Sequence, residues 1–359
     1  MVIRNTYIAL LLAAVLLGGC TPKEQEQAGG RKPKLVFRLA SELKPDSKIW
    51  DISRLFKEEI ERASPDGSIE AGEIQVIFYD QGMVGTERQL LETCYFDVIE
   101  MIQINSSVVT TVDPAYSMLD LPYLFLTEEH HKAVMYGDIG ARFLNRLRDK
   151  GLVGLGFYST GFRNLFYKQD AGKPGAQTPE DLRGLKIRVM ESPIMISSIN
   201  ALGASATPIP FSELFQGLKT GVVDGAENSA RIFVSYKYHE AGCNFFTLTE
   251  HFANQHTLIA NARWLAGLEP KYRKRVEEVA RVIIPRFDAV WDETTRDSIV
   301  EMQKLGVTVN AVKDKRPFIR RAAEVIDSYH EQYPEIPMDL LDAITELGKA
   351  YIVSNGGQP

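Results

Sequence analysis

The chain has 359 residues, of which 45% are hydrophobic and 25% charged, so it is long enough for two domains that each bury a core. Lysine and arginine number 41 against 47 aspartates and glutamates, which gives a formal charge of −6. An acidic chain with scattered charges excludes a dedicated nucleic-acid binder, and the composition excludes collagen, coiled coil and wholesale disorder.

The N-terminus has the pattern of an export signal over residues 1–19. Arg4 precedes an apolar run of about ten residues, which is too short to span a bilayer. Small residues stand directly before Cys20 and resemble the lipobox of bacterial lipoproteins, which are cleaved before the cysteine and acylated on it. An ordinary signal peptide with a chance cysteine is the alternative. The polar residues 20–34 cannot bury enough surface to fold, which indicates a linker behind a lipid anchor.

From residue 35 the hydrophobic period switches between 2 and 3.6, which predicts alternating strands and helices. Thr86 and Gln89 form a capping box that opens one of these helices. Pro285 is predicted to break or bend another. In chain order, the predicted strands lie at 35–39, 74–78, 98–104, 151–158, 185–190, from 222, and 258–261. The predicted helices lie at 52–63, 86–94, 127–149, 193–202, 212–219, 270–305, 317–330 and 338–352.

This alternation implies an α/β fold with parallel, doubly wound sheets, and its length favours two lobes. The first lobe is predicted over 35–160 plus about 254–290, and the second over 161–253 plus about 291–359. The helical stretch at 270–305 would bridge both. Ligands of such sheets bind beyond the carboxyl ends of the strands, so we expect a cleft between the lobes.

Motifs for common catalytic and cofactor sites are missing from the sequence. The glycine cluster at 151–156 has the wrong order for a dinucleotide site and predicts a packed strand. No phosphate loop and no nucleophile elbow occurs. Histidines at zinc-helix spacing are also missing, so no metal or cofactor is implied, and each histidine is assigned a structural or surface role. Cys94 and Cys243 are predicted to be buried free thiols, because they lie in different predicted lobes.

Two arginines stand at positions that suit an anion. Arg188 lies inside the predicted strand at 185–190, and Arg163 follows Gly161 and Phe162 where a glycine-rich strand emerges. A guanidinium at a strand end suits a carboxylate, because its planar fork matches both oxygens. Spacing alone leaves open an arginine paired with a structural aspartate or glutamate.

Four segments, in this order, resemble the solute-binding subunits of tripartite ATP-independent periplasmic (TRAP) transporters. They are PEDLRGLKIRV at 179–189, LGASATP at 202–208, PFSE at 210–213 and GVVDGAEN at 221–228. Supporting similarity is found at 85–91, 120–125 and 248–251, and the resemblance runs over about 35–345. It implies the two-lobed fold of periplasmic binding proteins, with a long bridging helix and a ligand cleft.

The resemblance also implies the residues of the site. Arg188 matches the arginine that binds the ligand carboxylate, and Arg163 matches a second arginine that points into the site. Asn228 matches an asparagine that bonds the ligand, and Phe211 an aromatic residue that lines the cleft. Glu227 is interpreted as structural, although it is acidic and near the anion.

One position departs from the family pattern. Gln89 stands where the family often has glutamate, which puts the polar contact from that helix in doubt and leaves Glu87 or Arg88 to substitute. The segment at 190–193 is similar to variants that bind sugar acids such as glucuronate and galacturonate. Hydroxyl partners for such a ligand would be Glu42, Glu191 and Asn228.

We therefore expect a monomeric, lipid-anchored extracytoplasmic or periplasmic protein that captures a sugar acid by closing its lobes. It would deliver this ligand to the membrane subunits of a TRAP transporter. The alternatives are a C4-dicarboxylate or other organic-acid binder of the same class, an exported sugar-acid enzyme, and a binding protein that serves a sensor. An enzyme would add an acid–base pair or a metal to the cleft, which no spacing here indicates.

Overall fold

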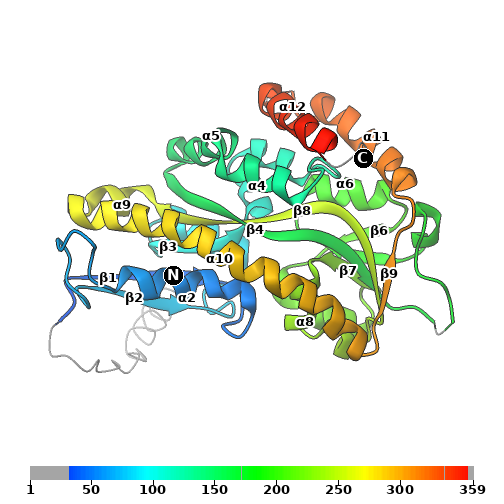
Figure 1. The fold of residues 1–359 in the computed structure, drawn as a ribbon, viewed down its shortest axis with the longest axis horizontal. Coiled ribbons are helices and arrows are strands. Elements are labelled where there is room, and N and C mark those ends of the chain that lie inside the picture. The colour runs from blue at the N-terminus through cyan, green and yellow to red at the C-terminus, as the bar shows by residue number, and fades with distance from the viewer. Residues whose placement is uncertain (1–31, 171, 335, 355–359) are drawn as a thin grey trace, which may run out of the picture. The chain divides into compact units, whose positions relative to one another are not determined.

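A mixed sheet runs through the protein and carries helices on both faces (Figure 1). The computed structural model describes residues 32–170, 172–334 and 336–354, and the residues from Pro33 onward form one unit. The predicted signal and Cys20 lie outside the described residues. No helix within these ranges combines the length and the apolar character needed to cross a membrane.

The strand order is β2-β1-β3-β8-β4-β7-β5-β6. Strand β8 pairs with β3 near its C-terminal end and with β9 at its N-terminal end. Parallel pairing joins β1 to β2 and β3, and β5 to β6 and β7. We call β2, β1 and β3 the first wing of the sheet and β7, β5 and β6 the second wing. The bounds are β1 Leu35–Ser41, β2 Ile74–Tyr79, β3 Met101–Asn105, β4 Leu152–Tyr167, β5 Lys186–Val189, β6 Ser205–Pro208, β7 Gly225–Asn228, β8 Phe245–Asn261 and β9 Thr308–Ala311.

The prediction of parallel, doubly wound sheets is wrong for the centre of the molecule. Strands β4 and β8 are antiparallel to each other, β3 is antiparallel to β8, and β7 to β4. The reason is topological: β4 carries the chain from the first wing to the second, and β8 carries it back. Both strands run through the predicted lobe boundaries at 160 and 253 without ending, so the assignment of residues to lobes stays a prediction.

Helices cover the two faces of the sheet in separate groups. Phe37 and Leu39 of β1 join a core with α2, α8 and α10, whereas Ala40 points to the opposite face and a core with α3, α4, α5 and α12. A third core lies on that opposite face at the second wing, under α6. The bounds are α2 Asp51–Ile60, α3 Glu87–Tyr95, α4 Glu128–Tyr136, α5 Asp138–Arg146, α6 Pro193–Ala201, α7 Leu214–Thr220, α8 Ala230–Ser235, α9 Ala262–Gly267, α10 Pro270–Lys304, α11 Arg316–Gln332 and α12 Met338–Ser354.

The long helix α10 spans both wings, as predicted for the stretch at 270–305 (Figure 1). Its first half bonds α2 through Arg286 Nη1 and Glu59 Oε2 at 3.0 Å, and its second half reaches α8 through Glu301 and Arg231. The helix continues through Pro285, so of the predicted break or bend the break is wrong and the bend stays a prediction. The helix predicted at 127–149 is instead divided at Gly137 into α4 and α5.

The prediction of two free thiols is confirmed. Cys94 and Cys243 are both buried and neither forms a disulfide. Burial raises the pKa of the Cys243 thiol to about 12, and it also raises the pKa of Cys94. Both side chains therefore act as small apolar groups in the cores.

Candidate ligand-binding cleft

Residues at the carboxyl ends of parallel strands from both wings line two adjoining hollows, which together form the cleft. The outer hollow has about 480 Å³ of open space and the inner hollow about 310 Å³. They share four lining residues: Glu87, Arg188, Met190 and Phe211. All seven contact residues predicted from the sequence line one hollow or the other. Those of the outer hollow are Glu42, Arg88, Arg188, Glu191 and Phe211, and those of the inner hollow are Arg163, Arg188, Phe211 and Asn228.

Arg188 is a buried cation whose guanidinium is only partly bonded. It lies in β5 with 2% of its surface exposed, and its Nε donates to the Ile209 carbonyl at 2.7 Å. Its Nη1 is buried and has no hydrogen-bond partner among the described residues. The guanidinium carbon lies 5.9 Å from the centre of the Phe211 ring. Burial lowers the pKa of Arg188, because the guanidinium is withdrawn from water. A buried cation with an unbonded donor is a group that an anion in the cleft could pair with.

Arg163 has a different role in the same cleft. Its Nε and Nη2 donate to the Glu227 carboxylate, the latter at 2.8 Å, and its Nη1 donates to Asn254 Oδ1 at 2.7 Å. Burial lowers the pKa of Arg163, but the charge and hydrogen bonds of Glu227 outweigh this and raise it above its ordinary value. The fork of Arg163 is therefore held by the protein, as the structural interpretation of Glu227 requires.

Asn228 offers a hydrogen-bond donor to the inner hollow. It is the last residue of β7 and is 4% exposed. Its Oδ1 accepts from the Ser229 amide at 2.9 Å and from Asn254 Nδ2 at 3.3 Å. Because both contacts use the oxygen, the NH₂ group is left for the hollow that Asn228 lines.

Two carboxylates stand opposite the arginines. Glu42 follows β1, and its Oε1 accepts from the Ser212 amide at 2.8 Å while its Oε2 accepts from the Glu87 amide at 3.0 Å. Glu87 begins α3, and its Oε1 accepts from the Asn105 amide at 2.8 Å. Burial and then the charge of Glu42 raise the pKa of Glu87 to about 8. The protonated side chain can donate to an oxygen of a ligand.

The start of α3 explains what Gln89 does at the position where the family often has glutamate. Thr86 and Gln89 form the predicted capping box, with the Thr86 amide donating to Gln89 Oε1 at 2.9 Å. Gln89 is thus used by the helix end, and Glu87 and Arg88 line the outer hollow instead. Arg88 is exposed and pairs with Glu92 at 3.5 Å.

Two polar residues of the inner hollow were missed as site residues. His256 was assigned a structural or surface role, yet it lines the hollow at 5% exposure and stacks on Tyr158. Burial and then the charge of Arg163 lower its pKa to about 3, so the ring is neutral. Asn105, which ends β3, lines the same hollow. Its place at the end of a predicted strand was the signal that could have identified it.

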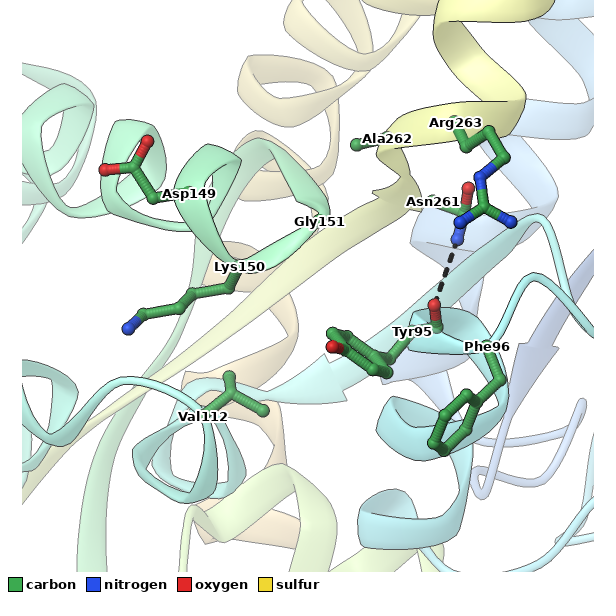
Figure 2. A pocket seen from close by; sticks show the side chains of 9 residues that line it. All are labelled: Tyr95, Phe96, Val112, Asp149, Lys150, Gly151, Asn261, Ala262 and Arg263. Atoms are coloured by element: carbon green, nitrogen blue, oxygen red, sulfur yellow. Dashed lines mark hydrogen bonds between the residues drawn. The ribbon is translucent and has the colours of Figure 1, made fainter.

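A separate depression lies beside the first wing, and Figure 2 shows its lining. It shares no residue with the cleft. Asn261 Nδ2 donates to the Tyr95 carbonyl at 3.3 Å across its wall, and its three charged residues, Asp149, Lys150 and Arg263, are all exposed. Because its charged residues are exposed, this depression has no counterpart of the buried guanidinium of Arg188 in the cleft.

Comparisons with known proteins agree with this geometry. Residues 41–332 match the family model described as bacterial extracellular solute-binding protein, family 7. A solute-binding protein of Chromohalobacter salexigens is 30% identical over 74% of this chain and 77% of its own length.

Two solved structures are similar over most of this chain. A TRAP periplasmic solute-binding protein from Xanthobacter autotrophicus, with bound β-D-galacturonate, has a TM-score of 0.77 at 30% identity and covers 87% of this chain and 99% of its own. One from Citrobacter koseri, with bound D-glucuronate, has a TM-score of 0.77 at 27% identity and covers 86% and 98%. The chain therefore belongs to family 7 of the bacterial extracellular solute-binding proteins, the solute-binding class of the TRAP transporters.

Proposed function

We propose that this protein binds a sugar acid of the hexuronate type, with the ligand carboxylate on the fork of Arg188. The observation that carries the proposal is the buried Nη1 of Arg188, which has no partner in the described residues. The galacturonate and glucuronate bound by the two similar structures support the same ligand class.

The charges of the cleft favour one carboxylate with hydroxyl groups over two carboxylates. A C4-dicarboxylate needs a second cation, but Arg163 is bonded to Glu227 and Arg88 pairs with Glu92 at the rim. The charge of Glu42 would also repel a second carboxylate, whereas Glu42 and the protonated Glu87 suit the hydroxyls of a sugar. Glu191 at the rim is proposed as a further hydroxyl partner.

A thermal-shift screen over uronates, aldonates, C4-dicarboxylates and 2-oxo acids tests the ligand class. A ligand at about 100 times its dissociation constant adds roughly 2.7 kcal/mol of stability, so the best binder gives the largest rise in melting temperature. We expect a hexuronate to give it. A larger shift with succinate or malate would overturn the sugar-acid proposal and leave the family assignment intact.

We also propose that Cys20 carries a lipid which holds the exported protein at the membrane, beside the transporter subunits that receive the ligand. The proposal rests on the small residues before Cys20 and on the polar linker after it. Cys20→Ser is expected to abolish labelling by a fatty-acid analogue and to release protein that still binds ligand. Wild-type protein without acylation would overturn the anchor.

A further inference from the structure

The side chain of Asn254 connects three lining residues of the inner hollow that come from three different strands. Asn254 lies in β8, is 1% exposed and is not itself in the lining. Its Oδ1 accepts from Arg163 Nη1 at 2.7 Å and from Asn105 Nδ2 at 2.8 Å, and its Nδ2 donates to Asn228 Oδ1 at 3.3 Å. One amide thus joins β3 of the first wing to β4 and to β7 of the second.

The direction of each bond follows from Arg163. A guanidinium can only donate, so the atom of Asn254 that it contacts must be Oδ1, and Nδ2 must face Asn228. Nδ2 in turn can only donate, so Asn228 must present its Oδ1, which the Ser229 amide also requires. The NH₂ group of Asn228 is therefore turned to the hollow by a chain of bonds that begins at Arg163.

The orientation of Asn254 also fixes the amide of Asn105, in the first wing. Because Asn254 presents Oδ1, Asn105 must approach with Nδ2, and its Oδ1 accepts from the Ser107 amide at 3.0 Å. The Nδ2 of Asn105 also lies 3.3 Å from His256 Nε2. Nε2 of the neutral ring must then accept, which places the ring proton on Nδ1. That atom is buried and unpartnered in the described structure, in a residue that lines the hollow.

An irregularity in the sheet fixes the backbone of Asn254. The β4–β8 register runs from Ser159 opposite Gln255 to Phe162 opposite Ala253, so two residues of β4 oppose Asn254 alone. One of them, Thr160, donates its hydroxyl to the Asn254 carbonyl at 3.0 Å. This is a β-bulge, a device that aims side chains beside functional sites.

We propose that Asn254 is a positioning residue that sets the hydrogen-bond polarity of the cleft, holding Asn228 and His256 as donors so that the site selects oxygen-rich anions. This proposal rests on the proposed function, because it assumes that the ligand is a sugar acid. Asn254 acts through its neighbours and does not touch the ligand.

A double-mutant cycle measured by titration with D-glucuronate and D-galacturonate tests this coupling. Asn254→Ala is expected to weaken binding about tenfold, the equivalent of one net hydrogen bond. In an Asn228→Ala background the same change is expected to cost about twofold or less, because Asn228 is gone and only the indirect link to His256 through Asn105 remains. Equal losses in both backgrounds would mean a structural role independent of Asn228 and would overturn the proposal.

The isosteric variant Asn254→Asp sharpens the test and serves if the alanine variant does not fold. It keeps acceptors for Arg163 and Asn105 but turns an oxygen toward Asn228 Oδ1, so Asn228 must rotate and present its own oxygen to the anion. We expect weaker binding than in Asn254→Ala. Asn261→Asp is the matched control, because it makes the same change at a buried asparagine of the same strand that does not line the cleft. It keeps the acceptor for the Trp264 amide and, like Asn254→Asp, loses the donor, here to the Cys94 and Tyr95 carbonyls. Wild-type affinity in Asn254→Asp would contradict the proposal.

A measurement without ligand separates this inference from the proposed function. The side-chain NH₂ resonance of Asn228, assigned by its loss in Asn228→Ala, is expected to shift in Asn254→Asp and to stay in place in Asn261→Asp. If the wild-type protein binds none of the sugar acids, the proposed function fails while this spectrum still decides the role of Asn254. An Asn228 resonance that does not move in Asn254→Asp would refute it.

Discussion

Arg188 and Arg163 lie in one cleft and differ in what their forks contact. Arg163 is bonded to Glu227 and Asn254. Arg188 gives a hydrogen bond to a carbonyl, and its buried Nη1 has no partner in the part of the chain that the structure describes. The first is therefore part of the scaffold and the second is available to an anion. This contrast allows the two arginines to serve as controls for each other.

Arg188→Ala is expected to weaken sugar-acid binding by about 2–5 kcal/mol, because the ligand carboxylate loses its buried partner. The melting temperature of the unliganded protein should change little. Arg188→Lys should rescue only in part, since an ammonium lacks the planar fork. Arg163→Ala should instead destabilise the unliganded protein by about 3–5 kcal/mol, because Glu227 is left buried and charged. Titration and melting of the three variants check this; near-native affinity in Arg188→Ala would contradict the site.

The buried carboxyl of Glu87 predicts a pH dependence. Its pKa of about 8 in the folded protein is above its ordinary 4.5, so the folded state holds a proton that the unfolded state releases. This contribution to stability is complete below the unfolded pKa and is lost as the pH rises through the folded pKa. Between about pH 5 and pH 8, the unfolding free energy should fall with a slope of at most about 1.4 kcal/mol per pH unit from this group.

Denaturant unfolding of unliganded protein across this pH range measures the slope. Glu87→Gln should reduce it, and Glu191→Gln at the exposed rim should leave it as in the wild type. An unchanged slope in Glu87→Gln would mean that the carboxyl is ionised in the fold.

At the residue scale, the sequence allowed the direct contacts to be predicted better than the residues behind them. Arg188, Asn228 and Phe211 stand in motifs whose order resembles a family, and all three line the cleft. Asn254 and His256 lie in a continuous buried strand, where the pattern does not distinguish core from site. Whether an asparagine turns its oxygen or its NH₂ group to the cleft depends on long-range hydrogen bonds, which no local sequence pattern contains.

At the element scale, most helices and the short strands β1, β2, β3 and β5 were predictable, because their caps and periods are local, whereas the four-residue strands β6 and β9 were not predicted. The two central strands were not. Strands β4 and β8 have 16 and 17 residues, but the alternation indicated only 151–158 and 258–261. Both are buried for most of their length on both faces, so their polar residues, such as Thr249, Asn254 and His256, do not alternate with apolar ones. The β-bulge opposite Asn254 was hidden for the same reason.

Gly161 in that bulge has a φ of +75°, in the left-handed region. A Cβ there would meet no atom closer than 3.9 Å, so the backbone conformation alone requires glycine. Gly161→Ala should destabilise the protein by about 1–2 kcal/mol and weaken ligand binding, because the bulge aligns Asn254. Gly267→Ala is the control, since that glycine has ordinary φ and open space. Equal melting temperatures for the two variants would contradict this account of the bulge.

At the scale of the whole molecule, polar bonds from the segment after β1 join the two sides of the cleft. Glu42 bonds the amides of Ser212 and Glu87, and the Lys44 amide donates to the Tyr236 hydroxyl at 3.1 Å. These contacts hold the segment after β1 against the segments that carry Phe211 and Tyr236. Glu42 is thereby a bridge across the cleft, and its contact with a ligand hydroxyl remains a prediction.

Glu42→Gln should loosen this bridge, because the amide of glutamine can accept from one backbone N–H but opposes the other with its NH₂. We expect the sugar acid to dissociate about tenfold faster, which corresponds to one lost hydrogen bond. Stopped-flow displacement of bound ligand measures the rate. Glu213→Gln, at an exposed position in the same turn, is the control, and equal dissociation rates in the two variants would rule out the bridge.

The unbroken course of β4, β8 and α10 through both wings has a mechanical consequence. Because these three elements continue through both wings, opening of the cleft must bend them along their length. The elastic restoring force then grows with the angle by which the wings separate. The unliganded protein should then sample a continuous range of cleft openings around one mean. Distances between spin labels on the two wings should give one broad distribution that narrows and shortens with ligand. Two separate peaks would instead indicate a switch between discrete shapes.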